Sequence, residues 1–157
     1  MSYLGKVRIG QKAPDWRCEA VHKGVIEGVL EHLSATDIVA LTHTTSDVTL
    51  GSYINLSTKP GVDNKDAPWL IIWFIPAAFS FVCPTEVLAF QNCLEEFKDR
   101  NCGVVFVSVD TKHSLWRWQN VPRQYDGLGQ IDVSLLSDAT HRMSRDYGVL
   151  IEDEGVS

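Results

Sequence analysis

The stretch from residue 69 to residue 98 constrains the fold most, because an apolar run is followed by a helical pattern after one short loop. Residues 69–75 are continuously apolar, which is typical of a strand buried on both faces in a parallel sheet. The helical pattern spans residues 81–98. Its apolar members recur at intervals of three and four and are Val87, Phe90, Leu94 and Phe97. Together the two patterns predict a strand, a loop and a helix packed on the strand.

Two further elements repeat this order. Residues 103–109 form a second apolar run and predict a second buried strand. Residues 114–120 predict a helix that ends before Pro122, since proline cannot continue a helix. The order strand, helix, strand, helix predicts an α/β class with right-handed crossovers between parallel strands. A length of 157 residues fits a single domain that spans residues 1–157.

The part of the chain before residue 69 is less regular. Apolar residues in 25–33 have the spacing of one face of a short helix. Residues 38–41 are a possible strand, and residues 42–47 read as a polar loop. Residues 60–68 are rich in Gly, Pro, Asp and Asn, which predicts a loop with turns.

Composition limits the class of partner and the compartment. A net charge of −6 argues against non-specific nucleic-acid binding, which needs clustered Lys and Arg. No apolar run approaches the ~20 residues of a membrane span. The first residues show no secretory apolar region, and four cysteines in such a chain suggest reduced thiols. We therefore expect a cytoplasmic protein that binds neither nucleic acid nor membrane.

Cys83 lies where the helical pattern of residues 81–98 begins. A helix N-terminus carries unpaired N–H groups and partial positive charge. Both favour a thiolate over a thiol, and the thiolate is the nucleophile. Because Cys83 lies four residues before Val87, its side chain is expected on the inward face, in a pocket against the core.

The other cysteines are better explained as structural or incidental residues. Cys93 follows Cys83 by ten residues, or ~15 Å of helical rise, so the two cannot form a disulfide while the helix is intact. The sequence from Cys83 to Glu86 also lacks the second cysteine of a Cys-x-x-Cys disulfide reductase. Cys18 and Cys102 have no motif around them.

Histidines and arginines give weaker signals. The five histidines are scattered without metal-ligand spacing, so we expect no metal and no organic cofactor. His113 is expected to be a solvated residue at a helix start. Arg123 and Arg145 could approach the Cys83 pocket, although an exposed surface position is the more ordinary interpretation.

The sequence PAAFSFVCPTE at residues 76–86 resembles the active-site motif of the peroxiredoxins, Pro-x-x-x-Thr/Ser-x-x-Cys. The resemblance is closest to the typical two-cysteine group, which contains alkyl hydroperoxide reductases and thioredoxin peroxidases. Further motifs occur in the family's order at residues 10–16, 107–110, 135–138 and 146–150.

This resemblance implies a thioredoxin-like sandwich, in which helices flank a central mixed sheet. It also implies that the family's last strands and final helix, with its active-site arginine and resolving cysteine, lie outside these 157 residues. Without those strands, residues 69–75 are expected to present an open apolar edge. Residues 22–46 have no counterpart in the family pattern and are interpreted as an inserted segment.

The same resemblance implies a thiol-dependent peroxidase that reduces hydrogen peroxide and alkyl hydroperoxides, with a role in antioxidant defence and cell redox homeostasis. Cys83 would attack the peroxide and become a sulfenic acid. Donors to the peroxide would be the Ser80 hydroxyl and the backbone N–H groups of Val82 and Cys83. Pro76 would shield the pocket from water.

Two residues are expected to support this site. Glu86 lies in the first helical turn, where a carboxylate interacts favourably with the helix dipole. Trp118 matches a family tryptophan that packs near the active site.

The expected partners are a peroxide and thioredoxin or another thiol reductant. A homo-oligomer, either a dimer or a ring of dimers, is also expected, since Phe79 matches an aromatic residue of the family's ring interface. The alternative is a non-catalytic relative that acts as a redox sensor, a chaperone-like subunit or an assembly partner. Peroxide turnover that depends on Cys83 distinguishes the two.

Overall fold

The computed structural model describes residues 5–22, 25–27, 48–50 and 69–157. Its strands are β1 (Arg17–His22), β2 (Val25–Glu27), β3 (Val48–Thr49), β4 (Trp69–Phe74), β5 (Cys102–Ser108) and β6 (Ser134–Ser137). Its helices are α2 (Cys83–Asn92), α3 (Leu94–Asp99), α4 (Lys112–Asn120) and α5 (Arg142–Tyr147), with a 3₁₀ turn at Arg123–Tyr125.

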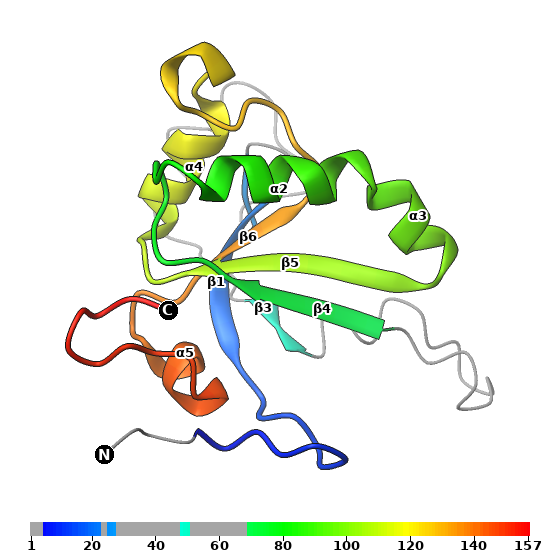
Figure 1. Cartoon of the computed structure of the whole chain (residues 1–157), viewed down its shortest axis with the longest axis vertical. Helices are drawn as coiled ribbons and strands as arrows, with labels where there is room; N and C mark the ends of the chain where they lie inside the picture. Colours follow the sequence, from blue (N-terminus) through cyan, green and yellow to red (C-terminus); the bar gives the residue numbers. More distant parts are fainter. Residues whose placement is uncertain (1–4, 23–24, 28–47, 51–68) are drawn as a thin grey trace, which may run out of the picture.

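The described strands form one mixed sheet in the order β2-β1-β6-β5-β4, with β3 paired to β1 (Figure 1). The neighbours β4, β5 and β6 run parallel to one another. β1 lies antiparallel to β6, to β2 and to β3. The predicted order of strand, helix, strand and helix is therefore confirmed, with parallel strands joined through helices.

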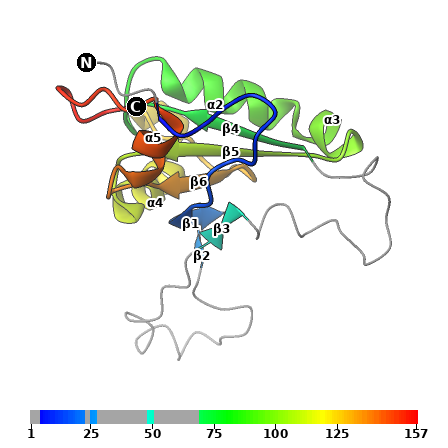
Figure 2. The ribbon, with the colours of Figure 1, turned by 90° about the horizontal axis from the view of Figure 1, so that it is seen from below.

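The two faces of the sheet carry two separate apolar clusters, because side chains alternate along each strand. On β5, Val104 and Phe106 point to the cluster under α2, α3 and α4. Val105 and Val107 point to the other cluster, which also contains Met143 of α5. Figures 1 and 2 show α2 and α3 on one side of the sheet and α5 on the other.

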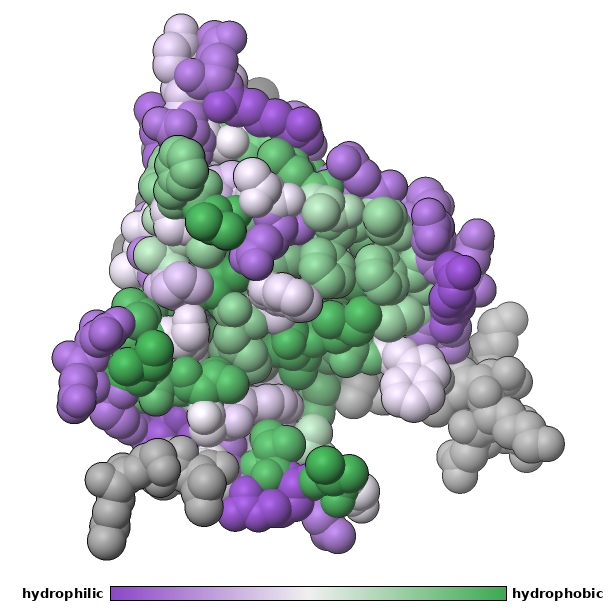
Figure 3. Space-filling view, viewed as in Figure 1, coloured by the Kyte–Doolittle hydropathy of each residue, from purple (hydrophilic) through white to green (hydrophobic). Residues whose placement is uncertain are grey.

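Among the described strands β4 lies at the edge of the sheet, as the expected open apolar edge of residues 69–75 requires. The prediction that these residues are buried on both faces was wrong for β4. Within the described ranges β4 pairs with β5 alone. Four of its six residues are half-buried, whereas Trp69 and Trp73 are 75% and 37% exposed. Figure 3 shows apolar side chains gathered in the middle of the face where Figure 1 places β4 and α2. A continuous apolar run identifies a strand but does not tell an edge from an interior position.

Two helix predictions also need correction. The single helix expected over residues 81–98 is two helices, because the backbone leaves helical geometry at Cys93, with φ −100° and ψ 9°. Of the helix expected over residues 25–33, residues 25–27 are instead β2. There the β-branched Val25 and Ile26 pair with the edge of β1. The remainder of that prediction, and those for residues 38–47 and 60–68, lie outside the described residues, as does most of the proposed insertion 22–46.

Candidate active site

The loop from residue 75 to residue 82 connects the end of β4 to the start of α2 and contains most of the predicted site. The Ile75 N–H donates to the Val107 carbonyl at 2.9 Å, which extends the pairing with β5 by one residue. The Ala78 N–H donates to Asp110 Oδ2 at 2.6 Å. Phe79 has a φ of 57°, a left-handed conformation that bulky residues rarely adopt. The loop is thus fixed at its first residue and again in its middle.

α2 begins at Cys83 without a side-chain cap. Val82 occupies the N-cap position and has no side chain that could accept a hydrogen bond. The nearby Thr85 hydroxyl donates to the Val82 carbonyl at 2.7 Å, and the Thr85 N–H donates to the same carbonyl at 3.0 Å. Pro84 has no N–H group to satisfy. The positive end of the helix is therefore left for other acceptors at the position where Cys83 lies.

Cys83 is 4% exposed and belongs to the apolar cluster under α2. Val87, one turn later on the same face, is fully buried in the same cluster. The prediction that the Cys83 side chain faces the core is confirmed.

Ser80 lies three residues before Cys83, and its hydroxyl oxygen is buried without a hydrogen-bond partner among the described residues. An unpaired buried hydroxyl costs roughly 1–3 kcal/mol, which makes such a group rare in a folded protein. Ser80 also lines a cleft of about 300 Å³. The other residues that line the cleft are Phe79, Phe81, Pro84, Leu88, Arg123, Asp126 and Gly127. Ser80 is the one predicted catalytic residue in that lining.

The remaining predicted residues differ in their exposure to solvent. Pro76 is exposed at the end of β4 and lies outside the lining of the cleft. Glu86 is half-buried in the first turn of α2. Trp118 is fully buried in the cluster that holds Cys83, and its indole N–H donates to the Asp126 carbonyl at 3.2 Å. Its ring lies against that of Phe79, with centroids 6.2 Å apart. Trp118 therefore packs against the loop of residues 75–82 through Phe79, in agreement with the packing role predicted for it.

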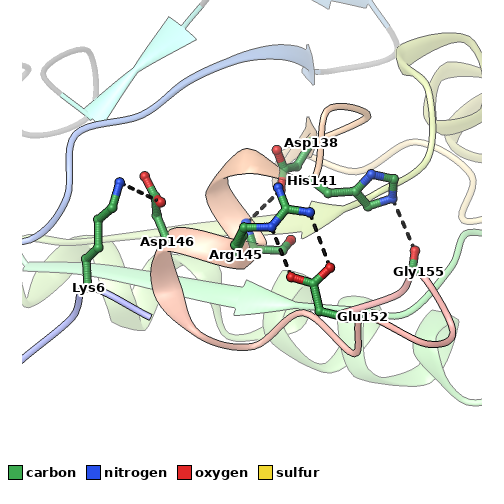
Figure 4. Close-up of polar contacts among 8 residues, drawn as sticks. Lys6, Asp138, His141, Arg145, Asp146, Glu152 and Gly155 are labelled. Carbon is green, nitrogen blue, oxygen red and sulfur yellow. Dashed lines mark hydrogen bonds and ion pairs between the residues drawn. The ribbon is translucent and has the colours of Figure 1, made fainter. Parts of the chain in front are cut away.

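The two arginines differ in position. Arg123 lines the cleft, and its Nε donates to the Leu128 carbonyl at 3.3 Å. Arg145 lies on α5 and binds both carboxylate oxygens of Glu152, at 3.0 and 3.3 Å (Figure 4). This hydrogen bonding lowers the pKa of Glu152 below its ordinary value. Of the two, Arg123 is the cation that shares a cleft with Ser80.

The thiols and other side chains give no sign of a different chemistry. All four cysteines, each inside the described ranges, are free thiols; Cys93 is exposed and Cys18 is buried. His113 is exposed in the first turn of α4. Within the part of the chain that the structure describes, no group of three His, Cys, Asp or Glu side chains is arranged to hold a metal ion. No described helix is long and apolar enough to cross a membrane.

Sequence reasoning missed Asp110, although it recognised the strand end that carries it. Asp110 follows β5, and its carboxylate reaches across 32 residues to the Ala78 N–H. The signal was its place after a buried parallel strand, since functional side chains gather at the carboxyl ends of such strands. No local spacing shows that this carboxylate meets the Cys83 loop.

A buried thiol at a helix start without a side-chain cap, on an α/β sandwich, is the arrangement of a thiol-dependent α/β protein. The family model described as AhpC/TSA family matches residues 9–157. The chain therefore belongs to the AhpC/TSA family, which confirms the resemblance that its motifs showed.

The relatives that match carry peroxiredoxin names. "Peroxiredoxin TSA1" of Saccharomyces cerevisiae is 47% identical over 96 residues, covering 61% of this chain and 49% of the relative. "Peroxiredoxin-2" of Macaca fascicularis is 35% identical over 153 residues, covering 98% of this chain and 62% of the relative. The chain thus spans about half to three fifths of the length of these relatives.

The fold has a solved counterpart. The reduced 2-Cys peroxiredoxin of Plasmodium vivax superimposes with a TM-score of 0.70 at 30% identity, covering 95% of this chain and 62% of that one. The predicted thioredoxin-like mixed sheet with flanking helices is confirmed by this likeness.

Proposed function

We propose that this protein is a thiol peroxidase in which Cys83 reduces hydrogen peroxide and alkyl hydroperoxides. One observation carries the proposal: the buried Cys83 thiol, at a helix start without a side-chain cap, follows by three residues a buried hydroxyl that has no partner among the described residues. An unpaired donor at such a position is costly for folding and useful for binding a peroxide oxygen. The family relationship supports the same activity.

The reaction balances as a two-electron oxidation of the thiol. The Cys83 thiolate attacks one peroxide oxygen, the S–O bond forms and the O–O bond breaks. The products are a cysteine sulfenic acid and an alkoxide, which takes a proton to become an alcohol, or water in the case of hydrogen peroxide. Negative charge develops on the departing oxygen. The Ser80 hydroxyl and the backbone N–H groups of Val82 and Cys83 are the donors that would stabilise it.

The other site residues act around this centre. Trp118 and Phe79 hold the loop, and Glu86 interacts with the positive end of α2. The shielding role of Pro76 stays a prediction, because Pro76 is exposed and lies outside the lining of the cleft. Arg123, the cation in the cleft, supplies positive charge beside Ser80. Because both the sulfur and the Ser80 hydroxyl are buried, small hydroperoxides are favoured over bulky oxidants.

A thiol reductant must return the sulfenic acid to a thiol, with two thiols oxidised to a disulfide and water released. Thioredoxin is the proposed reductant, because relatives include proteins named "Thioredoxin-dependent peroxide reductase". We also propose a homo-oligomer, in which Phe79, 44% exposed, contributes to the contact. The cytoplasmic location stays a prediction, since these same relatives are named as mitochondrial.

The test is peroxide consumption by the purified 157-residue chain with excess dithiothreitol as the reductant. Cys83→Ser is expected to lower the rate to that of dithiothreitol alone, because the attacking sulfur is lost. Cys93→Ser is the matched control and is expected to keep the full rate, because Cys93 is exposed at the break between α2 and α3. Equal rates for the wild type and Cys83→Ser would refute the peroxidase and leave the non-catalytic relative as the better interpretation.

A further inference from the structure

Asp110 joins the end of β5 to the loop that precedes Cys83. Its Oδ2 accepts the Ala78 N–H at 2.6 Å and the Ser108 hydroxyl at 2.7 Å. The Asp110 N–H in turn donates to the Ser108 hydroxyl oxygen at 3.2 Å. Ser108 is buried, with 1% of its surface exposed. The carboxylate orientation is therefore fixed by a closed pair of hydrogen bonds before it meets the loop.

The backbone of Asp110 is held as firmly as its side chain. The Ser137 hydroxyl, at the end of β6, donates to the Asp110 carbonyl at 2.7 Å. The Asp138 N–H donates to the Ser108 carbonyl at 2.8 Å. Asp110 is thus tied to the ends of two neighbouring parallel strands, β5 and β6.

On the loop side, the Ala78 N–H is the contact nearest to the reacting groups. Ala78 lies two residues before Ser80, and Phe79 between them has the unusual φ of 57°. A left-handed bulky residue persists only where its surroundings hold it. The Phe79 ring contact with Trp118 and the Ala78 bond to Asp110 are what hold this turn. The direction of the Ser80 hydroxyl depends on that turn.

We propose that Asp110 is a positioning residue for peroxide reduction: through the Ala78 N–H it sets the loop geometry that aims the Ser80 hydroxyl and the α2 N–H groups at the peroxide. The inference rests on the proposed function. It predicts a selective defect, because breaking an O–O bond needs aligned donors whereas simple alkylation of the thiol does not.

The experiment compares two rates at Cys83 in the same chain, measured at single turnover. One is oxidation by hydrogen peroxide, and the other is alkylation by iodoacetamide. Asp110→Ala is expected to slow oxidation by about tenfold or more, since a misplacement near 1 Å can cost ~100-fold. Alkylation is expected to stay the same or rise, because a loosened loop exposes the buried thiol. Asp110→Asn keeps an acceptor oxygen and is expected to restore most of the oxidation rate.

Asp138→Ala is the matched control. Asp138 also follows a parallel strand and also accepts backbone N–H groups, but those belong to Met143 and Ser144 of α5. It is expected to leave the ratio of the two rates unchanged. If Asp110→Ala does not fold, Ser108→Ala takes its place, because it frees the carboxylate to rotate; a drop in the ratio of about threefold is then expected.

Hydrogen exchange of the Ala78 amide gives a readout that does not depend on catalysis, and it is expected to be faster in Asp110→Ala than in the wild type. A wild type without fast Cys83 oxidation would refute the proposed function itself. A fast wild type matched by Asp110→Ala, or a loss of both rates together, would refute only the role of Asp110.

Discussion

The helices α2 and α5 both follow strands of the parallel part of the sheet, yet their first turns are built in opposite ways. At α5 the buried carboxylate of Asp138 accepts the Met143 N–H at 3.1 Å and the Ser144 N–H at 2.7 Å. At α2 the N-cap position is Val82, and no side-chain oxygen accepts from the first turn. One helix start is satisfied internally, and the other is left available.

The difference shows how stability and function divide within one sheet. The satisfied start belongs to a six-residue helix whose Met143 packs in the apolar cluster on that face of the sheet, and Asp146 of the same helix forms an ion pair with Lys6 at 2.8 Å. The unsatisfied start carries the buried thiol of Cys83 and lies beside the unpaired hydroxyl of Ser80. Ser144, in the first turn of α5, also has a buried hydroxyl without a partner among the described residues, so the two helix starts differ in their backbone N–H groups and in the thiol.

Ser80→Ala is expected to have the largest effect, on the rate of Cys83 oxidation, and therefore tests the contrast between the starts of α2 and α5 most strongly. Removing one donor to a developing oxyanion typically lowers the rate by ~100-fold or more, so oxidation of Cys83 by peroxide should fall by that amount. The unfolding free energy should stay unchanged or rise by up to about 1 kcal/mol, because the lost hydroxyl had no partner. Stopped-flow peroxide kinetics and urea unfolding measure the two quantities. Ser80→Thr is the control, and a large loss of stability in Ser80→Ala would show that the hydroxyl is a structural group.

The second prediction concerns the start of α5, where a substitution is expected to change stability and not peroxide kinetics. Asp138→Ala leaves the N–H groups of Met143 and Ser144 without their acceptor, so the unfolding free energy should fall by about 2 kcal/mol. Peroxide kinetics of the folded protein should not change, because α5 lies on the other side of the sheet from Cys83. Urea unfolding, run beside the kinetics, checks both statements. A slower reaction of Cys83 would mean that the two helix starts are coupled.

The smallest effect concerns alkaline pH on the α5 side. Burial raises the pKa of Tyr147 above its ordinary value of 10.0. A raised pKa in the folded state means that the stabilisation is complete below pH ~10 and is lost as the pH rises through the folded value. The unfolding free energy should therefore decline above pH ~10 in the wild type and decline less in Tyr147→Phe. Tyr125→Phe, at a tyrosine 66% exposed, is the control. Equal slopes in all three proteins would contradict the burial effect.

Much of the fold could be predicted because it depends on local pattern. The apolar runs at residues 69–75 and 103–109 identified β4 and β5 within one or two residues. The intervals of three and four in residues 81–98 placed Cys83 and Val87 on the buried face. The edge position of β4 was expected from the family resemblance and not from local pattern, since it depends on which strands pair, and pairing joins distant residues.

In the candidate site, too, residues of a local motif could be predicted, whereas contacts between distant segments could not. Cys83 and Ser80 could be predicted because both belong to one contiguous motif, residues 76–86, which can be read directly from the sequence. The bond between Asp110 and the Ala78 N–H joins two segments that only the sheet brings together. The pairing of Val25–Glu27 with β1 likewise reflects a tertiary contact that outweighs local helical spacing.

The most direct test of the central contrast asks which cysteine reacts first. The chain is exposed briefly to one equivalent of hydrogen peroxide, the sulfenic acids are trapped in denaturant, and peptide mass spectrometry locates them. An activated site at the start of α2 predicts that buried Cys83 is oxidised well before exposed Cys93. Oxidation of Cys93 at the same rate as Cys83, or faster, would contradict the account, because accessibility alone would then determine reactivity.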